Sequence, residues 1–359
     1  MATAMATATL QHGHQTSQRV AWVDIARAIA MFLVFFGHLG DSWFPALRQV
    51  LAAIYTFHMP LFFLLSGLFF KPDIPFGALL RRRGKTLLVP YYAFSCFALV
   101  GPIVKLVRPS LYTQIGKSTA VNPVDDIIGI MLAKGNSGLW FLWSLFVALI
   151  CLWLLVKATR GNRLVLLLVL LLCIVANYLL AQNDAVAQLP FQLGKIFEAT
   201  GWAGLGYIAA QTLDIKRLES GRYSIRLAWL VVLILAFLAL VYLATFRSIA
   251  SDRAPLYYVL LFFTTVAGIA ASICLSLVMP SLSWVCKIGR YSLVLYALND
   301  LALKVTKFGL FSVGHIPVAK LPFWPELGIG LLVVITAMLL CYWANACVQR
   351  YARWSVGDF

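Results

Sequence analysis

The residues WVDIARAIAMFLVFFGHLG at 22–40 and LRQVLAAIYTFHMPLFFLLSGLFF at 47–70 determine the fold of this chain. Each stretch is apolar and long enough to cross a bilayer as a helix, for which about 20 residues are needed. The polar side chains within them that a bilayer penalises include Asp24, Arg27, His38 and His58. Because a charged side chain at the membrane centre costs roughly 2.5–3.5 kcal/mol, we expect these residues to face the interior of a helix bundle and to serve a function.

The spacing of the polar residues in the first stretch predicts one polar stripe along a helix. Arg27 and His38 are eleven residues apart, which places them within about 20° of each other and about 16 Å apart along the axis. Asp24 precedes Arg27 by three residues and Asp41 follows His38 by three, so each base has an acid within helical reach. The stripe ends in His38, whose imidazole titrates near neutrality. Asp41 or Asp24 would fix its tautomer, and Asp24 is better placed to pair with Arg27.

The composition places the chain among helical integral membrane proteins. Of its 359 residues, 62% are hydrophobic and 12% are charged, which leaves too few charges to solvate a soluble protein of this size. The apolar runs are continuous, as in membrane helices, and do not alternate as in barrel strands. The net charge of +16 does not indicate nucleic-acid binding, because Lys and Arg gather in short loops between apolar runs. The seven Cys residues lack the spacing of a disulfide framework or a metal site, so we expect no metal.

Ten apolar runs predict an all-α, polytopic membrane protein with a single domain over 19–359, preceded by a disordered tail at 1–18. The predicted spans are 21–39, 47–70, 87–107, 139–157, 164–181, 193–212, 227–246, 257–279, 291–311 and 326–346. The longest connection, 108–138, either touches the membrane interface or covers the site. Most Lys and Arg lie near the two termini and after the even-numbered spans, so we expect both termini in the cytoplasm. Arg27 then lies toward the cytoplasm and His38 toward the outer face.

These residues resemble the membrane acyltransferase-3 family. The resemblance is carried by an Arg and a His eleven residues apart in the first helix, followed by FHMPLFFLLSG at 57–67. The later spans match mainly by helix count, with LWFLWSLF at 139–146 and GRYSLVLYALND at 289–300. Within the family, the chain looks most like the fucose 4-O-acetylase-like branch, with bacterial exopolysaccharide (xanthan-type) and Nod-factor O-acetyltransferases as relatives.

The resemblance implies an enzyme of the bacterial cytoplasmic (inner) membrane. It implies transfer of an acetyl group from cytoplasmic acetyl-CoA to a hydroxyl of a cell-surface, exopolysaccharide or lipid-linked sugar. Such a reaction needs a base, a grip on the donor and a path between donor and acceptor. We assign the base to His38, while Arg27 would guide the pantetheine arm or stabilise negative charge on the thioester oxygen. Direct attack by the sugar hydroxyl and an acetyl-His intermediate both remain open.

The loop KPDIPFGALLRRRGKTLLVPYY at 71–92 is rich in cations. One interpretation is an anchor that fixes the topology. The other is a site for the phosphates of coenzyme A, because Arg binds phosphate through two parallel hydrogen bonds and Lys supplies a point charge. The two are compatible, and the resemblance favours the second. The residues that we expect to bind the donor are Arg81, Arg82, Arg83 and Lys85.

Four further polar or aromatic residues are candidates for substrate binding. Pro60 would free backbone carbonyls to line a cavity beside His58, although a His there could instead pack against a neighbouring helix. Trp140 begins a span, where it is either an interfacial anchor or a surface for stacking a sugar ring. Asn299 and Asp300 lie midway through a span, where polar groups need partners. Family members often carry His in place of Asn299, so we expect this pair only to orient a substrate.

A transporter or flippase of lipid-linked sugars is the competing function. Buried charges and helices broken by proline occur in transporters as well. Transporters often contain a repeated half, however, and the later spans hold no second copy of the Arg-to-His stripe or of FHMP. A longer acyl donor such as succinyl-CoA is the alternative within the enzymes.

Overall fold

The computed structural model describes residues 20–98, 123–134, 138–180, 183–187, 189–215, 217–245, 254–314 and 321–357. Every regular element in these ranges is a helix, which confirms the prediction of an all-α protein. The expected disordered tail at 1–18 lies outside the described residues, as do parts of the third span and of the 108–138 connection.

The described elements follow one another along the chain as α, 3-10 or π helices. They are α1 (Ala21–Gly37), η1 (Pro45–Leu47), α2 (Arg48–Tyr55), α3 (His58–Gly67), α4 (Phe76–Arg83), η2 (Gly84–Leu88), α5 (Val89–Ala98), α8 (Pro123–Met131), α9 (Trp140–Ala158), α10 (Arg163–Leu180), α11 (Asp184–Ala187), η3 (Pro190–Lys195), α12 (Ile196–Thr212), η4 (Arg217–Ser220), α13 (Tyr223–Thr245), α14 (Ala254–Val278), α15 (Ser283–Arg290), α16 (Ser292–Lys307), η5 (Phe308–Val313), α17 (Phe323–Tyr351) and η6 (Arg353–Val356).

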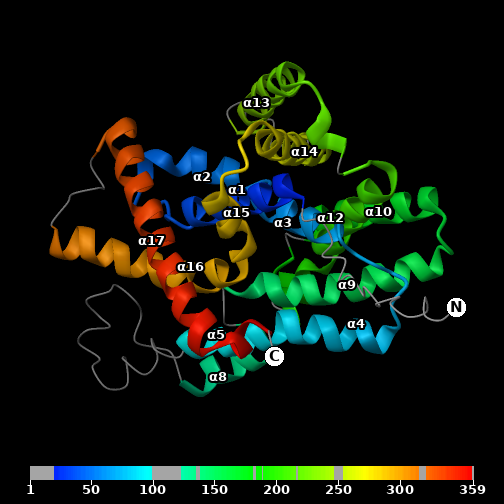
Figure 1. Cartoon of the computed structure of the whole chain (residues 1–359), viewed down its shortest axis with the longest axis horizontal. Helices are drawn as coiled ribbons and strands as arrows, with labels where there is room; N and C mark the ends of the chain where they lie inside the picture. The colour runs from blue at the N-terminus through cyan, green and yellow to red at the C-terminus, as the bar shows by residue number, and fades with distance from the viewer. Residues whose placement is uncertain are drawn as a thin grey trace, which may run out of the picture.

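Helix α1 is the central element of the bundle. It contacts α3, α14, α15, α16 and α17, so helices from the whole length of the chain pack around it. Figure 1 shows the α13–α14 pair on one side of α1 and α9 with α4 on the other. Small and large apolar residues of α1 are fully buried, among them Ala26, Ala30, Met31 and Phe35. The polar residues of this helix are therefore held inside the protein by a well-packed apolar helix.

Six segments of the described chain are long and apolar enough to cross a membrane. They are Pro45–Gly67, Trp140–Ala158, Arg163–Leu180, Tyr223–Ala244, Leu256–Val278 and Phe323–Tyr351. The protein is thus a polytopic membrane protein. The other predicted spans contain the shorter or more polar helices α1, α5, α12 and α16, so the total of ten stays a prediction.

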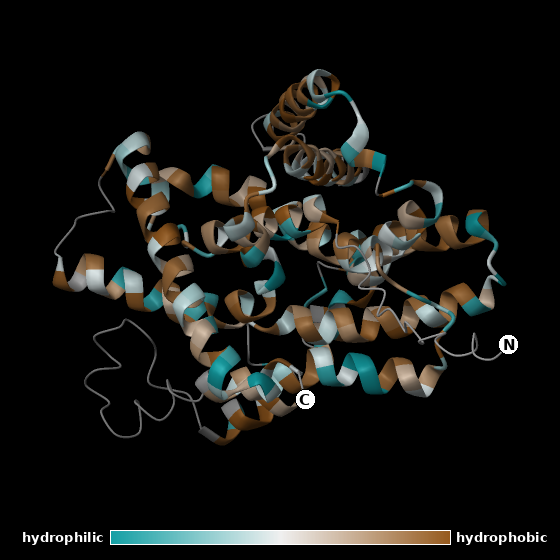
Figure 2. Cartoon of the chain, viewed as in Figure 1, coloured by the Kyte–Doolittle hydropathy of each residue, from teal (hydrophilic) through white to brown (hydrophobic). Residues whose placement is uncertain are grey.

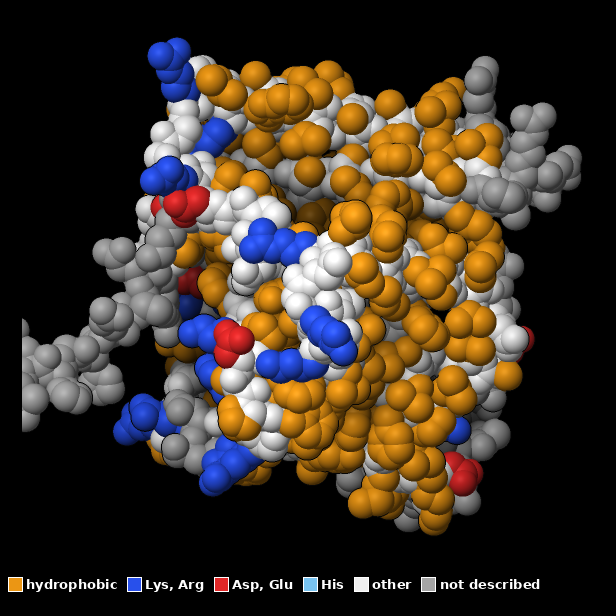
Figure 3. Space-filling model, turned by 90° about the vertical axis from the view of Figure 1, so that its right-hand side faces the viewer, with side chains coloured by type: hydrophobic (Ala, Val, Ile, Leu, Met, Phe, Trp, Pro, Cys, Tyr) orange, Lys and Arg blue, Asp and Glu red, His pale blue; other side chains and the backbone are white. Residues whose placement is uncertain are grey.

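The surface agrees with a membrane environment. Helix α13 is apolar around its whole circumference, and large side chains such as Trp229, Leu235 and Leu238 are more than half exposed. A helix that is hydrophobic all round is buried either in protein or in lipid. On the face drawn in Figure 3, Lys and Arg gather toward one side, whereas hydrophobic side chains cover most of the rest. This division is typical of a protein whose apolar band lies in a bilayer.

The second span is broken in the middle, near the predicted position. Helix α2 ends at Tyr55 and α3 begins at His58, so Pro60 lies in the first turn of α3. Proline is tolerated there because the N–H groups in the first turn of a helix have no acceptor within that helix, so proline, which lacks an N–H, breaks no helical hydrogen bond. The carbonyl of Thr56, in the break, accepts a hydrogen bond of 3.0 Å from the hydroxyl of Thr265 on α14. A neighbouring helix thus satisfies one carbonyl that the break releases.

Helices α3 and α12 approach each other through glycines. A Cβ atom added to Gly67 would lie 1.8 Å from the carbonyl oxygen of Ala203, and one added to Gly206 would lie 2.0 Å from that of Leu64. Small residues at membrane helix interfaces allow such close backbone contact. The glycines at 67 and 206 thus let α3 and α12 pack backbone against backbone.

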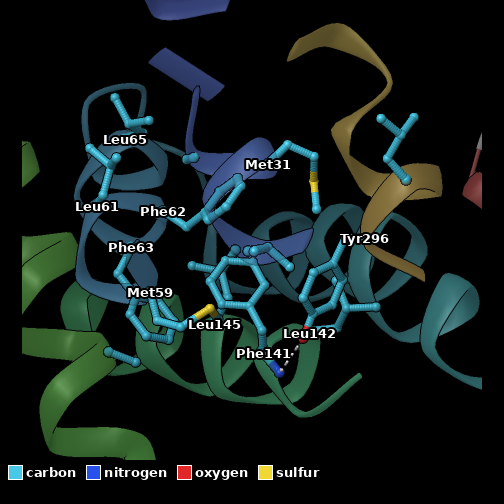
Figure 4. Packing of buried hydrophobic residues seen from close by; sticks show 14 of the residues in the cluster. Met31, Met59, Leu61, Phe62, Phe63, Leu65, Phe141, Leu142, Leu145 and Tyr296 are labelled. Atoms are coloured by element: carbon cyan, nitrogen blue, oxygen red, sulfur yellow. Dashed lines mark hydrogen bonds between the residues drawn. The ribbon is translucent and has the colours of Figure 1, made fainter. Parts of the chain in front are cut away.

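The core beside α1 is aromatic (Figure 4). The ring of Phe141 on α9 lies 4.8 Å from that of Phe63 on α3 and 5.6 Å from that of Tyr296 on α16. The backbone N–H of Phe141 donates a hydrogen bond of 3.3 Å to the Tyr296 hydroxyl. These contacts hold α3, α9 and α16 together around α1.

Candidate active site at the two ends of helix α1

The first end of α1 carries a charged cluster around Asp24, which is 7% exposed. One carboxylate oxygen lies 3.9 Å from Nη1 of Arg27, which confirms the predicted pair. The other oxygen accepts a hydrogen bond of 3.2 Å from Nε of Arg290. The sequence analysis did not single out Arg290, so it missed this contact.

Gly289 explains how Arg290 reaches Asp24. A Cβ atom at Gly289 would lie 1.9 Å from the carbonyl oxygen of Asp24, so only glycine permits this approach of α15 to α1. Arg290 follows directly and ends α15 beside the carboxylate. The stretch GRYSLVLYALND thus begins with a contact to the central helix.

Arg27 is directed toward the end of the second span. Its guanidinium carbon lies 5.6 Å from the ring centroid of Phe69, which follows α3. A guanidinium within about 6 Å of an aromatic ring is attracted by the electrons of the ring face. The side chain is 32% exposed, so Arg27 stays partly accessible while contacting both Asp24 and Phe69.

The second end of α1 presents His38. The helix ends at Gly37, and the N–H of His38 still donates to the carbonyl of Val34 at 3.0 Å, so His38 caps the helix. Its ring lies 6.2 Å from that of Tyr55, which in turn lies 5.1 Å from the ring of His58. The structure therefore brings the two predicted histidines together around Tyr55, a residue that the sequence analysis did not consider.

The predicted helical pairing of His38 with Asp41 is wrong. Gly40 adopts a left-handed φ of +82°, which turns the chain away from the helix axis. Asp41 then lies on the surface and forms an exposed ion pair of 3.8 Å with Arg48. Since α1 stops before His38, the three-residue spacing does not place Asp41 on the same helix face.

His58 is almost fully buried, at 1% exposure. Its Nδ1 donates a hydrogen bond of 2.9 Å to the carbonyl of Ile54, in the last turn of α2. A ring nitrogen beside a carbonyl oxygen must carry the proton, so the neutral ring keeps an acceptor lone pair on Nε2. His58 therefore bridges the break in its own span and does not pair with another helix through this nitrogen.

Lys307 supports the chain around His38. Its ammonium donates a hydrogen bond of 3.3 Å to the carbonyl of Leu39 and lies 5.7 Å from the ring centroid of Trp43. A cation at the C-terminal end of a helix is favoured by the helix dipole. The charges of Lys307 and Asp300 both act on the imidazole of His38.

Asn299 and Asp300 occupy different environments. Asn299 is fully buried and donates from Nδ2 to the carbonyl of Tyr296 at 2.8 Å, while its Oδ1 has no partner among the described residues. Asp300 is exposed and forms a close ion pair with Lys304. Only Asn299 therefore has the environment of a buried polar residue.

Glu326 is a buried acid that the sequence analysis missed. It is 0% exposed in the first turn of α17, and its Oε1 accepts hydrogen bonds from the N–H groups of Ala46 and Leu47 at 2.8 and 3.3 Å. The last long helix thus caps η1, the turn between the first two spans.

The ring of Trp140 forms a cation–π contact with Lys195. The ammonium of Lys195 lies 5.8 Å from its ring centroid and 3.9 Å from a carboxylate oxygen of Glu198. Lys195 and Glu198 are three residues apart, a spacing that brings two side chains together on one helix face, and here they form an ion pair.

The four predicted donor-binding cations lie on or directly after α4. Arg81, Arg82 and Lys85 are exposed, whereas Arg83 is half-buried and has an Nε without a partner in the described part of the chain. Burial, and the neighbouring charge of Arg82, lower the pKa of Arg83. The apolar side of α4 packs on α9, where the rings of Phe76 and Trp153 are 5.1 Å apart.

These features define a multi-pass membrane protein with polar groups at both ends of a buried central helix. A family model described as an acyltransferase domain, that of the acyltransferase-3 family, matches residues 20–345. The chain belongs to this family and is a membrane acyltransferase, an enzyme that acts on an acyl donor and an acceptor. No curated protein and no solved structure shows significant similarity to it.

Removing the charge of Asp24 tests the cluster at the first end of α1. We expect Asp24→Asn to lower the free energy of unfolding by about 1 kcal/mol, because Arg27 and Arg290 lose their shared carboxylate and both guanidinium groups are partly screened by solvent. Thermal unfolding of the purified protein measures this loss. Asp41→Asn, which removes an exposed pair, serves as the control and should change stability little. Equal effects of the two variants would contradict a structural role for Asp24.

Proposed function

We propose that this protein is an O-acetyltransferase of the bacterial cytoplasmic membrane. It transfers the acetyl group of cytoplasmic acetyl-CoA to a hydroxyl of a cell-surface, exopolysaccharide or lipid-linked sugar. The observation that carries this proposal is the arrangement of α1, which bears a guanidinium–carboxylate cluster at one end and an imidazole at the other. The proposal also takes the chain to belong to the fucose 4-O-acetylase-like branch of its family.

His38 acts as the general base. It removes the proton of the acceptor hydroxyl, the hydroxyl oxygen attacks the thioester carbonyl carbon, and the coenzyme A thiolate leaves. Three features support this role: the ring ends the central helix, it lies beside Tyr55, and it makes no hydrogen bond within the described residues. Its imidazole is therefore available to a substrate.

The acyl donor enters from the side on which both termini lie, which we assign to the cytoplasm. Arg81, Arg82, Arg83 and Lys85 bind its phosphates, and the Arg27 guanidinium lies between that port and the bundle. The contact of Arg27 with Phe69 supports this path, because Phe69 directly precedes the loop that leads to α4. The half-buried Arg83, with an unpartnered Nε, has a donor left for a phosphate oxygen.

The acceptor sugar approaches from the opposite side. His58 and Asn299 are the buried polar groups that orient it, and Trp140 offers a ring face for stacking. The free Nε2 lone pair of His58 and the unpartnered Oδ1 of Asn299 support hydrogen bonds to sugar hydroxyls. Asp300 acts on this site through its charge.

The proposal is tested with the purified protein in proteoliposomes. Acetyl-CoA labelled in the acetyl group is added outside, and transfer to an acceptor glycan and binding of acetyl-CoA are measured. Saturable binding together with labelled product supports an acetyltransferase. Sugar movement across the membrane without acetyl-CoA binding would instead assign a flippase, and labelling only from succinyl-CoA would change the donor.

The proposed donor port, formed by Arg81, Arg82, Arg83 and Lys85, predicts an effect on the KM for one substrate only. We expect the combined change of Arg81, Arg82 and Arg83 to Gln to raise the KM for acetyl-CoA by at least about tenfold, because charge-assisted hydrogen bonds to phosphate are lost. The KM for the acceptor should change little. Steady-state kinetics with each substrate varied in turn measures both values.

The matched control for this variant changes to Gln two exposed cations, Arg160 in the turn after α9 and Arg163 at the start of α10. Labelling of a single cysteine introduced into the 71–86 loop shows whether topology is preserved. If the KM values for acetyl-CoA and for the acceptor rose equally, or if the control showed the same effect, these arginines would not be the binding site of the donor.

A further inference from the structure

A polar cavity lies beside the first turns of α1, on a different side of the helix from Arg27. It has a volume of about 240 Å³ and lies between the first turns of α1, η4, the start of α13 and the end of α14. Trp22 and Ile25 of α1 line it; around the helix, Trp22 is offset by about 160° from Asp24 and Ile25 by about 160° from Arg27. The α13–α14 pair and α4 also lie on opposite sides of α1 (Figure 1). The cavity is therefore separate from the proposed donor port.

Arg226 supplies an unused hydrogen-bond donor at this cavity. Its Nη1 donates a hydrogen bond of 2.7 Å to the carbonyl of Leu277 at the end of α14. Its Nε is buried and has no partner among the described residues, although the side chain lines the cavity. A buried guanidinium N–H without an acceptor costs free energy, and phosphate oxygens match the guanidinium fork well.

Glu219 places a negative charge in the same cavity. Its Oε1 accepts a hydrogen bond of 3.0 Å from the backbone N–H of Trp22, which leaves the second oxygen for another donor. In the described part of the chain no ion pair joins Glu219 to Arg226, although both line the cavity. The cavity thus offers one cationic and one anionic group that do not neutralise each other.

We propose that this cavity binds a phospholipid headgroup that contains both a phosphate and a primary ammonium group. Arg226 binds the phosphate and Glu219 binds the ammonium group. The volume is below the roughly 300–1,000 Å³ of pockets for drug-sized ligands, so it holds a headgroup and not a whole coenzyme. A purely anionic headgroup would face the carboxylate of Glu219 and lose affinity.

The surrounding surface explains why the ligand is a lipid. Helix α13 leaves the cavity with an exposed apolar face, on which Leu227 and Val231 are both more than one third exposed. Acyl chains attached to a headgroup in the cavity can lie along this face in the bilayer. A soluble compound with the same headgroup would gain nothing from it.

The test measures lipid retention by the full-length protein. The purified protein is exchanged into detergent with phosphatidylethanolamine or phosphatidylglycerol of matched acyl chains, and bound lipid is counted by native mass spectrometry. We expect the wild type to retain the ethanolamine lipid about tenfold more strongly, the effect of about one charge-assisted hydrogen bond. Equal retention of the two lipids by the wild type would overturn the proposal.

Two substitutions test the roles of Arg226 and Glu219 separately. Arg226→Gln should lower retention of both lipids about tenfold, whereas Glu219→Gln should abolish the preference and keep the acceptor for the Trp22 N–H. Arg222→Gln, which removes an exposed cation four residues before Arg226, should change nothing. An equal loss in Arg222→Gln would show diffuse surface attraction and reject the site. If Arg226→Gln does not fold, the loss of preference in Glu219→Gln still decides the outcome.

A competition experiment distinguishes a lipid ligand from a soluble one. Soluble phosphoethanolamine at millimolar concentration should displace little of the bound lipid, because it lacks the acyl chains. Tight binding of the soluble compound together with no lipid retention would assign a soluble amino-phosphate and overturn the lipid proposal.

Discussion

His38→Ala is expected to reduce acetyl transfer by at least about 100-fold, the range contributed by a positioned general base. The hydroxyl of a sugar has too high a pKa to attack a thioester rapidly unless its proton is removed during the attack. Because the His38 ring contacts Tyr55 but makes no hydrogen bond in the described residues, its loss should leave the fold unchanged. Turnover of labelled acetyl-CoA in proteoliposomes measures the effect.

Two further measurements make this prediction specific. Binding of acetyl-CoA to His38→Ala should equal that of the wild type, since the proposed site for the donor phosphates is on α4 and does not include His38. Gln49→Ala, an exposed change on α2, serves as the control and should keep full activity. Turnover of His38→Ala close to the wild-type rate would exclude His38 as the base.

Gly67→Val is expected to prevent accumulation of folded protein. Its Cβ would lie 1.8 Å from the carbonyl oxygen of Ala203, a backbone atom in the middle of α12 that cannot shift locally. Forcing α3 and α12 apart would also open the aromatic core around Phe63. Overpacking of a core usually costs about 1–3 kcal/mol, and a backbone clash of this size costs more than that range.

Gly77→Val is the matched control for this substitution. Gly77 lies on α4, and a Cβ atom there meets nothing within 4 Å. Size-exclusion chromatography of a fluorescent fusion in detergent measures the folded fraction of both variants. A monodisperse Gly67→Val protein with wild-type stability would disprove the close contact between α3 and α12.

Local spacing in the sequence predicted the parts of the site that lie within one helix. The pairs Asp24–Arg27 and Lys195–Glu198 follow from a separation of three residues, and both are present. The break before Pro60 follows from the chemistry of proline. The assignment of Asp41 was wrong because the spacing rule holds only inside a helix, and the left-handed Gly40 comes between the helix and Asp41.

Contacts between distant parts of the chain could not be predicted from spacing. Arg290 meets Asp24 across 266 residues, Lys307 meets Leu39 across 268, and Glu326 meets Ala46 across 280. In the sequence these three charged residues have no partner at helical spacing. Their partners become apparent only in the folded structure. Their position depends on which helices pack around α1, and that choice is made by the core as a whole. The catalytic roles of the site residues remain predictions.

The cap that Glu326 forms on η1 has a consequence for biosynthesis. Helix α17 leaves the ribosome about 280 residues after η1, yet it holds the turn that follows the proposed catalytic histidine. While the chain is still being inserted, the N–H groups of Ala46 and Leu47 lack their carboxylate acceptor. A nascent chain ending before Phe323 would therefore carry every proposed donor-binding residue but an unfinished acceptor side, so we expect activity only once translation has passed α17.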